Sequence, residues 1–494
     1  MANRYAPPTP QYGSDGDHTA GSRLQRGTLN TNDIVFFVVA AAAPLTVMAG
    51  VAPLAIQIGG IGAPAAYLAV GVVLVLFSTG FTAMTPYIRN AGAFYAYIAR
   101  GLGRPAGVGA ALLAMFSYNA LQIGTYGAFG FFAASTVDGM AGIDLPWPLY
   151  AAFGVITVWF LGFRSINLGA KVLAALLIAE TAILVLLAVA VLLKGGASGF
   201  DLASFSPSHV FVPEMIAPLL TAVGAFIGYE ATVIFREEAR RPDRTVPRAT
   251  YVAVIFLAVF YTFVSWIIVQ AFGSDRVVAA ATDNPAEMFF IAMDTYVGGW
   301  ASDIQRILIV TSLLAALLAF HNAITRYAYA LASEKVFPAS LGRVHLLHGS
   351  PWIAGIAQSV VAAVVVAVFA LSALDPYTQF FLWVNTPGIL GLLILQALGA
   401  FAVVAFFRRN PPQHGEGTGR TLLAPVTAGV LLSAATVCIA TNFDLFTGAG
   451  PIVNWTLVAL TPLILLTGIV LALRIRRNHP ARYDRLGTTE VDAA

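Results

Sequence analysis

Charged residues are scarce in this chain. Only 10% of its 494 residues are Asp, Glu, Lys or Arg, whereas 58% are hydrophobic, and the mean hydropathy is +0.80. A soluble domain carries roughly 25% charged residues. The composition therefore excludes a soluble globular protein.

Cysteine is almost absent, because Cys438 is the only one in the sequence. A single thiol cannot form an internal disulfide, and we interpret Cys438 as a small buried apolar residue rather than a redox group. The patterns of catalytic sites are missing too. We find no metal-ligand spacing, no phosphate-binding glycine loop after a strand and no nucleophile elbow. We therefore expect no enzyme, no cofactor and no metal.

Long apolar runs are what the sequence does contain. Each is long enough for the roughly 20 residues of helix that cross a bilayer, and the runs are continuous rather than alternating, which excludes an outer-membrane barrel. We predict an all-α integral membrane protein with twelve transmembrane helices, the fourth of them short. The expected spans are Ile34–Ile56, Ala65–Met84, Ala106–Ala134, Pro148–Phe163, Val172–Leu193, Met215–Phe235, Tyr251–Phe272, Ile307–Leu331, Trp352–Leu371, Phe380–Phe407, Leu422–Ala440 and Ile452–Leu473.

The basic residues predict the orientation, because Lys and Arg are retained on the cytoplasmic side. With a cytoplasmic N-terminus, all but three of the 27 fall at or near cytoplasmic ends, the exceptions being Lys194, Arg276 and Arg306. We therefore place both termini on the cytoplasmic side of the cell membrane. Residues 1–32 are polar and predicted to be disordered, and 477–494 form a cytoplasmic tail. The net charge of +3 reflects this uneven cytoplasmic face and does not indicate nucleic acid.

Two of the predicted spans are interrupted. The first carries Pro44, which lacks the backbone N–H that a helix needs, and the sixth carries Gly228 and Glu230. Irregular backbone at membrane depth is tolerated only where protein or a water-filled cavity solvates it. A pair of interrupted segments at corresponding positions points to the binding site of a transporter.

The placement of the breaks divides the transporter domain, 33–476, into two repeats. Spans one to five (33–194) and six to ten (213–407) each begin with a broken helix, which is the layout of a 5+5 inverted repeat. Two additional helices, 422–473, then lie outside it. The connection from Gly273 to Asp303 is read either as a short gating helix pair or as a surface loop without a role.

Three motifs resemble those of the amino acid–polyamine–organocation transporters. They are EEARRPDRTVPRA (Glu237 to Ala249), NAGAFYAYIARGLG (Asn90 to Gly103) and FHNAITRYAYALASEKVFP (Phe320 to Pro338). The resemblance covers roughly 30 to 475 and implies a permease that moves amino acids or amines by alternating access.

The resemblance also implies where the substrate binds. In the family, exposed amides of the first broken helix hold the substrate carboxylate, and half-helix N-termini suit an anion. The matching stretch here has Ala and Pro in place of glycines, and an ordinary proline kink remains an alternative. The aromatic-Gly-acid pattern of the sixth span matches as well, and Gln122 and Tyr126 share one face of the third, pocket-lining helix. The candidate substrate-binding residues are Ala43, Pro44, Leu45, Thr46, Gln122, Tyr126, Phe226, Ile227, Gly228, Tyr229 and Glu230.

Three ionisable residues are candidates for ion coupling. Glu180 lies about 12 Å along the fifth helix from its start, where proton-coupled relatives often carry a Lys. It could exchange a proton, bind sodium, pair with a basic substrate or serve as a structural acid. Glu230 is too costly for a lipid-facing position and is read either as a gating group or as a structural partner of loose amides. His321 is a plausible relay, although an interhelical hydrogen bond is the commoner role.

The function predicted from the sequence is secondary active transport of amino acids or related amines, a small-molecule substrate, across the cytoplasmic membrane. Proton symport is the main hypothesis, with sodium as the other possible ion. An exchanger is the alternative, and a sensor that does not cycle is a third. The sequence leaves the oligomeric state open.

Overall fold

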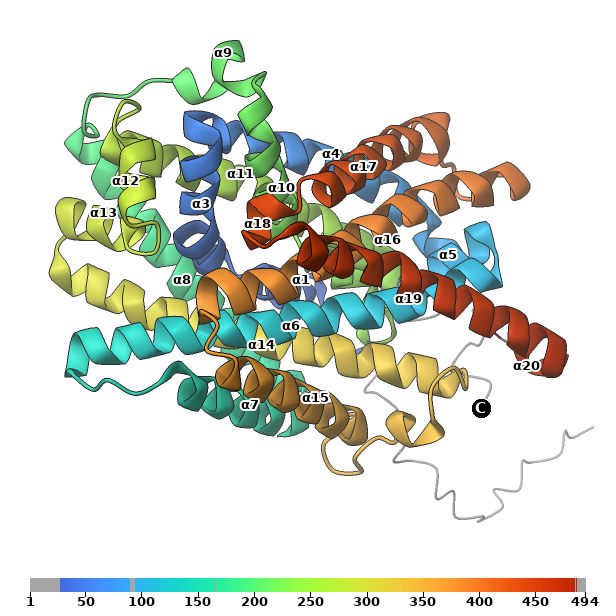
Figure 1. The fold of residues 1–494 in the computed structure, drawn as a ribbon. Helices are drawn as coiled ribbons and strands as arrows, with labels where there is room; N and C mark the ends of the chain where they lie inside the picture. The colour runs from blue at the N-terminus through green and yellow to red at the C-terminus, as the bar shows by residue number, and fades with distance from the viewer. Residues whose placement is uncertain (1–26, 89–93, 165, 485, 487–494) are drawn as a thin grey trace, which may run out of the picture.

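The computed structural model describes residues 27–88, 94–164, 166–484 and 486, and within them the chain is helical (Figure 1). These residues form no β-strand, and one isolated parallel bridge joins Leu29 to Ala239. Part of the predicted disordered N-terminus, the first four residues of the Asn90–Gly103 motif and half of the predicted C-terminal tail lie outside the described residues.

Eleven helical stretches within the described residues are long and apolar enough to cross a membrane. Each predicted span lies in one of them or overlaps it to within two residues, including the short fourth span, which is α7 (Trp147–Arg164). The unbroken long helices are α4 (Ala63–Met84), α6 (Arg104–Ala141), α7, α8 (Ile166–Lys194), α11 (Pro242–Phe272), α14 (Gly299–Ser333), α15 (Trp352–Leu371), α16 (Leu382–Arg409), α17 (Ala424–Thr441) and α19 (Pro451–Asn478).

The first of the eleven stretches, Thr31–Tyr87, holds both the first and the second predicted spans. Its 57 residues would make a straight helix of about 85 Å, far more than the ~30 Å of a hydrocarbon core. It consists of α1 (Thr31–Ala42), α2 (Pro44–Thr46), a π-helical turn, α3 (Ala52–Gly59) and α4. Gly60, with a φ of 70°, separates α3 from α4, and Figure 1 shows α4 leaving α3 in another direction.

The sixth predicted span is also divided. Its first part is α10 (Ile216–Ala225), and its second part is a 3-10 helix, Tyr229–Glu238. The connection from Gly273 onward forms two short helices, α12 (Val277–Asp283) and α13 (Met288–Tyr296), as one of the two readings of this connection expects. Figure 1 places them together at the left end of the molecule.

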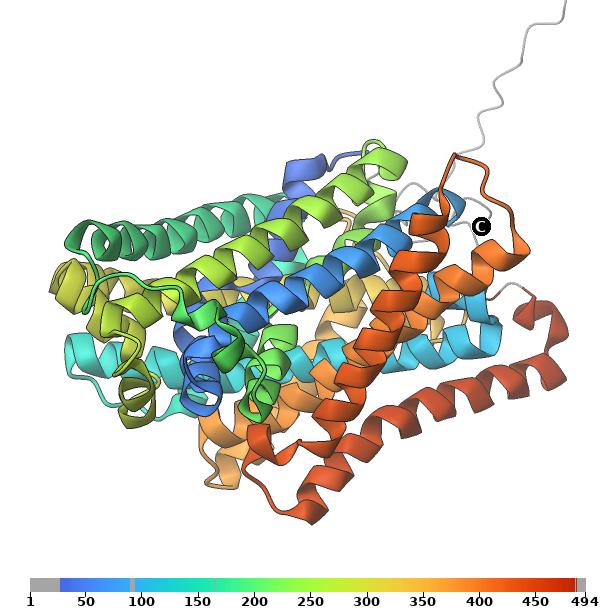
Figure 2. The ribbon, with the colours of Figure 1, turned by 90° about the horizontal axis from the view of Figure 1, so that it is seen from above.

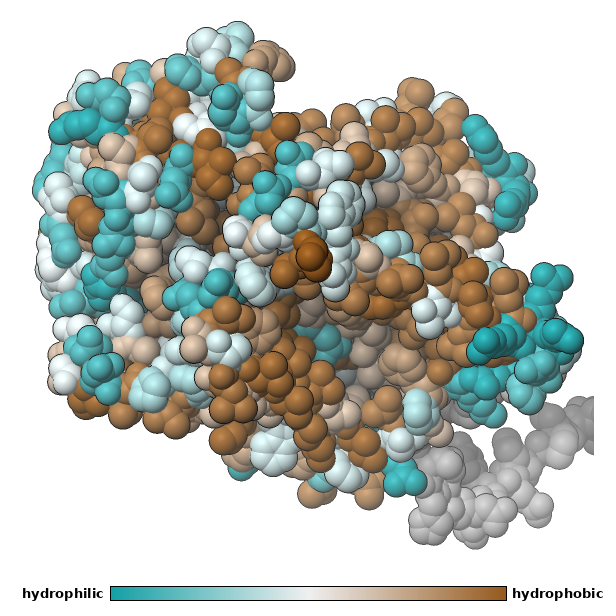
Figure 3. All heavy atoms as spheres, viewed as in Figure 1, coloured by the Kyte–Doolittle hydropathy of each residue, from teal (hydrophilic) through white to brown (hydrophobic). Residues whose placement is uncertain are grey.

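The centre of the bundle is built on α6, which packs against α14, α16 and α19, while α1 packs between α8, α11 and α14. Figure 2 shows these long helices running roughly along one direction. Outer helices present large apolar side chains to the surroundings, such as Phe153 and Ile156 on α7. In Figure 3, hydrophilic residues gather at the left and right ends, and hydrophobic residues make up much of the surface between them. This distribution is that of an integral membrane protein.

Close helix contacts depend on small residues. A Cβ added at Gly468 on α19 would lie 2.6 Å from the Gly109 Cα and 2.7 Å from the Val108 carbonyl oxygen on α6. Backbones approach this closely in membrane bundles only where side chains are small.

We expect Gly468→Ala to push α19 away from α6 and to lower the thermal stability of the purified protein. Overpacking typically costs about 1–3 kcal/mol. Gly139→Ala is the matched control, because a Cβ at that position on α6 meets nothing within 4 Å. Equal melting temperatures for the two variants would contradict the close contact.

Candidate functional site

The first break is centred on Ala43, which adopts a left-handed conformation with φ 45° and ψ 70°. Its N–H still donates to the carbonyl oxygens of Val39 and Ala40, both at 3.1 Å, so it ends α1. Pro44 then starts the short α2, where its missing N–H would have had no helical partner in any case. The proline therefore restarts the helix as well as breaking it.

A buried carboxylate caps this restarted helix. Glu180 on α8 is 1% exposed, and its Oε2 accepts a hydrogen bond from the Leu45 N–H at 3.3 Å. A negative charge at a helix N-terminus is favourable because the backbone N–H groups there have no partners in the helix. Glu180 Oε1 is buried and has no hydrogen-bond partner among the described residues.

The same carboxylate joins a third helix. Ser312 on α14 donates to Glu180 Oε2, and the Thr46 hydroxyl donates to the Ser312 hydroxyl at 3.2 Å. On the other side of the break, the Tyr261 hydroxyl from α11 donates to the Ala42 carbonyl oxygen at 3.1 Å. Sequence reasoning did not single out Ser312 or Tyr261, since neither residue type at membrane depth carries a distinctive signal.

The second break is held by its own acid. Gly228 has a φ of 114°, and its N–H donates to Glu230 Oε2 at 3.0 Å. The other oxygen of Glu230 accepts from the Tyr118 hydroxyl on α6, also at 3.0 Å. Both carboxylate oxygens of Glu230 are therefore bonded, one to the break and one to a neighbouring helix. Glu230 thus bonds an amide of the break, which is the structural role that the sequence analysis considered for it.

The two breaks touch. A Cβ built on Gly228 would lie 2.9 Å from the Ala41 Cβ and 3.3 Å from the backbone of Ala41 and Ala42. Two constraints favour glycine at this position. Other residues rarely adopt its φ, and the first break occupies the space that a side chain would fill.

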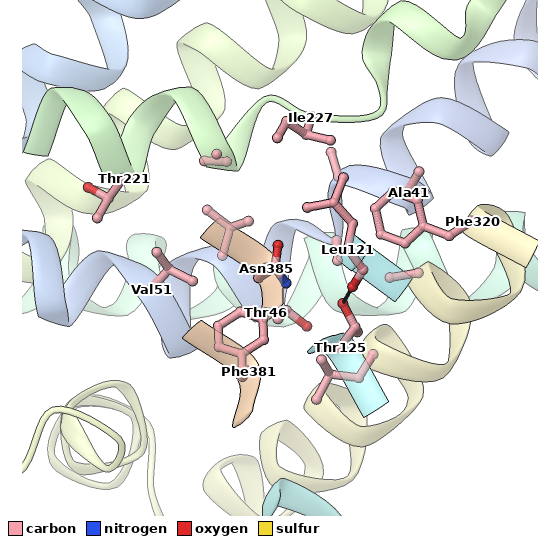
Figure 4. A pocket seen from close by; sticks show the side chains of 17 residues that line it. Ala41, Thr46, Val51, Leu121, Thr125, Thr221, Ile227, Phe320, Phe381 and Asn385 are labelled. Carbon is pink, nitrogen blue, oxygen red and sulfur yellow. Dashed lines mark hydrogen bonds between the residues drawn. The ribbon is translucent and has the colours of Figure 1, made fainter. Parts of the chain in front are cut away.

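A cavity of about 90 Å³ lies beside the contact between the breaks (Figure 4). This volume holds more than one water molecule. Both breaks contribute to it, together with α6, α14 and α16. The lining residues are Ala41, Ala42, Ala43, Thr46, Val47, Val51, Leu121, Thr125, Thr221, Gly224, Ala225, Ile227, Leu313, Ala316, Phe320, Phe381 and Asn385.

Three of the substrate-binding candidates, Ala43, Thr46 and Ile227, line this cavity. The other candidates of the breaks are not among its lining residues. On α6 the cavity is lined by Leu121 and Thr125, each one residue before a candidate, and the Thr125 hydroxyl donates to the Leu121 carbonyl oxygen at 2.7 Å (Figure 4).

The two candidates on α6 take part in a different contact. The Gln122 amide nitrogen donates to the Leu317 carbonyl oxygen of α14 at 3.0 Å and lies 3.5 Å from the Tyr126 hydroxyl. These side chains join α6 to α14. The residues of α6 that line the cavity each precede a predicted residue by one position. The predicted face of the helix is therefore not the face that lines the cavity.

His321 lies away from the cavity. It lines a separate small cleft between α7, α14 and α15, with Trp159, Thr325 and Trp352 among its neighbours. A Cβ at Gly162 would come within 2.4 Å of the imidazole, so the ring is packed directly against the α7 backbone. Its Nδ1 is buried without a hydrogen-bond partner among the described residues.

The end of the bundle at which α1 begins is closed by buried contacts. Arg326 on α14 donates to Glu238 Oε1 at 2.7 Å, with side chains 7% and 2% exposed. The Arg326 guanidinium lies over the Phe235 ring, which stacks on Phe37 of α1 at 4.9 Å. Backbone hydrogen bonds from Leu29 to Glu238 and from Arg240 to Leu29, both 2.9 Å, complete the closure.

The cavity extends from the breaks toward the opposite end. Its lining includes Val51 beyond the first break and Thr221 before the second, whereas it includes no residue of the 3-10 helix after Gly228. Near that end, the Tyr377 hydroxyl donates to the Gly50 carbonyl oxygen. Within the described part of the chain, no group of three His, Cys, Asp or Glu side chains could hold a metal ion.

A family model described as "Amino acid permease" matches residues 30–470. The chain belongs to the amino acid permease family. The resemblance inferred from the three sequence motifs is thereby confirmed.

Several relatives are named transporters. One of Mycobacterium tuberculosis (strain H37Rv), an uncharacterized transporter, is 28% identical over 207 residues, which are 42% of this chain and 44% of the relative. An uncharacterized transporter of Legionella pneumophila is 23% identical over 69% of this chain and 74% of its own. A branched-chain amino acid permease of Bacillus subtilis is 24% identical over 38% and 37%. The matches to the mycobacterial and Bacillus relatives thus cover less than half of their length.

We expect Gly228→Ala to weaken ligand binding strongly while expression is retained. The added methyl group must adopt an unfavourable φ, at a cost of about 1–3 kcal/mol, and it presses against Ala41. Binding is measured by ligand-induced thermal stabilisation. Gly399→Ala is the control, since a Cβ there makes only ordinary contacts at 3.6 Å or more. Unchanged binding by Gly228→Ala would mean that the contact between the breaks does not shape the site.

Proposed function

We propose that this protein is a secondary active transporter that moves amino acids across the cell membrane by alternating access. One observation carries the proposal. Two interrupted helices, each in a stretch apolar enough to cross a membrane, touch each other and line one cavity together. An enzyme or a passive anchor has no need of such an arrangement, whereas paired broken helices frame the substrate site in transporters.

The breaks offer groups for both ends of an amino acid. The Leu45 N–H is taken by Glu180, and the next N–H of the restarted helix, that of Thr46, lies in the first turn, where α-helices leave N–H groups for anions. The last turn of α10 leaves carbonyl oxygens, of which those of Val223 and Gly224 accept from Phe226 and Ile227. The Ala225 carbonyl oxygen at the helix end is suited to an ammonium group.

We propose twelve membrane crossings in a 5+5 inverted repeat, with α17 and α19 outside it and both termini cytoplasmic. The stretch Thr31–Tyr87 then counts as two crossings, divided at Gly60. In this orientation the closed end with Arg326 and Glu238 faces the cytoplasm, and the cavity extends toward the outside. The branched-chain amino acid permease among the relatives supports an amino acid as the substrate.

Proton-coupled symport is the proposed mode, with Glu180 as the group that carries the proton. Glu180 Oε1 is buried without a hydrogen-bond partner in the described part of the chain, and Oε2 touches both the first break and α14. Movement of the restarted helix would change the hydrogen bonds of this carboxylate, which links its protonation to the conformation. Exchange of one amino acid for another metabolite is the alternative mode.

Uptake of radiolabelled amino acids into proteoliposomes under an imposed proton or sodium gradient tests the proposal. We expect accumulation above equilibrium that requires the proton gradient. Uptake only into liposomes preloaded with counter-substrate would favour the exchanger. No uptake of any amino acid under any condition would contradict transport.

Glu180→Gln should abolish accumulation driven by the proton gradient and leave exchange of internal for external substrate, because glutamine keeps the shape but cannot bind and release a proton. Glu214→Gln, at an exposed carboxylate, is the control. Accumulation by Glu180→Gln at the level of the unmodified protein would show that this residue does not carry the coupling proton.

A further inference from the structure

The cavity between the breaks has no ionisable lining. Among the described residues that form its wall there is no Asp, Glu, Lys, Arg or His. Its polar side chains are three threonines and an amide, Thr46, Thr125, Thr221 and Asn385, and all other lining residues are apolar or glycine. Figure 4 shows Thr46 and Asn385 near the middle of this view, with Phe381 below them and Phe320 to the right.

The two buried acids nearby do not supply a charge to the wall. Glu230 has both oxygens bonded, to Gly228 and to Tyr118. Glu180 bonds through Oε2 to Leu45 and Ser312. Neither residue lines the cavity, so each acid serves the backbone breaks and the helices around them.

A charged substrate side chain would therefore be desolvated without a counter-charge. Burying an unpaired ammonium or carboxylate costs several kcal/mol even after relaxation. An aliphatic side chain in the same space gains about 0.8 kcal/mol for each CH₂ group removed from water. The wall thus favours neutral apolar side chains over basic, acidic or diamine ones.

The wall of the cavity that α14 forms could set the size of the substrate side chain. The helix α14 presents Leu313, Ala316 and Phe320 to the cavity at positions i, i+3 and i+7, which share a face. Ala316 is the smallest of the three and lies between two large neighbours. Because its methyl group is smaller than either neighbouring side chain, a larger residue at this position would reduce the space in the cavity.

We propose that the substrate is an amino acid with an uncharged aliphatic side chain and that Ala316 limits its size. The inference rests on the proposed transport function and narrows its substrate class. It removes basic amino acids and polyamines, which the family resemblance had left open.

Ligand-induced thermal stabilisation of the purified full chain tests the substrate class. The panel contains alanine, valine, leucine and isoleucine, compared with lysine, arginine, glutamate, putrescine and spermidine. We expect at least tenfold tighter binding of one or more aliphatic amino acids than of any charged ligand. Tighter binding of lysine or putrescine would overturn the inference and leave amino acid or amine transport intact. Stabilisation by nothing in the panel would contradict the proposed function as well.

The size limit is tested with Ala316→Leu, which should weaken leucine and isoleucine binding at least tenfold and alanine binding much less. Ala363→Leu on α15 is the matched control, since Ala363 is exposed on the outer surface. An equal loss for all ligands would overturn the role of Ala316. If the leucine variant fails to fold, Ala316→Gly decides: it should strengthen binding of larger side chains relative to alanine, and an unchanged ranking contradicts the role.

Discussion

The structure depends on how the backbone groups freed by two helix breaks are satisfied in a membrane-embedded core. At the first break a buried carboxylate, Glu180, accepts the Leu45 N–H, while Tyr261 donates to the Ala42 carbonyl oxygen. At the second break Glu230 accepts the Gly228 N–H. Without such partners, each buried polar group would cost several kcal/mol in a medium that offers no water. The two acids therefore each satisfy a backbone N–H group that a helix break frees.

The same interactions connect the breaks to the surrounding helices. Glu180 joins α8 to α14 through Ser312, and Glu230 joins the second break to α6 through Tyr118. A shift of either half-helix must therefore rearrange hydrogen bonds on its neighbours. The buried Arg326–Glu238 pair closes one end of the bundle in this arrangement. A buried pair of this kind is weak support for stability but a good switch, because breaking it leaves an uncompensated charge that needs water.

The sequence was sufficient for the helices and for the position of both breaks. Long apolar runs must form helices in a bilayer. Pro44 lacks a backbone N–H, and Gly228 permits backbone angles that other residues rarely adopt, so both mark breaks in a helix. The burial of Glu230 followed from the cost of exposing a charge to lipid. The partners that distant helices supply could not be predicted, because Glu180, Tyr261 and Tyr118 lie more than 100 residues from the groups that they bond. The exception is Glu230, which is two residues from Gly228. Nor could the helix face at Gln122: spacing shows that Gln122 and Tyr126 share a face, but a rotation of one residue, about 100°, decides whether the cavity sees them or Leu121 and Thr125.

The central claim is that the cavity framed by the two breaks holds the substrate and opens to one side of the membrane at a time. The most direct measurement is the labelling rate of Val51→Cys, in a Cys438→Ser background, by a membrane-impermeant maleimide applied from either side of reconstituted vesicles. Val51 lines the cavity beyond the first break. The account predicts labelling from the outer side that a bound amino acid slows. Equal labelling from both sides at once, or a rate indifferent to every amino acid, would contradict it.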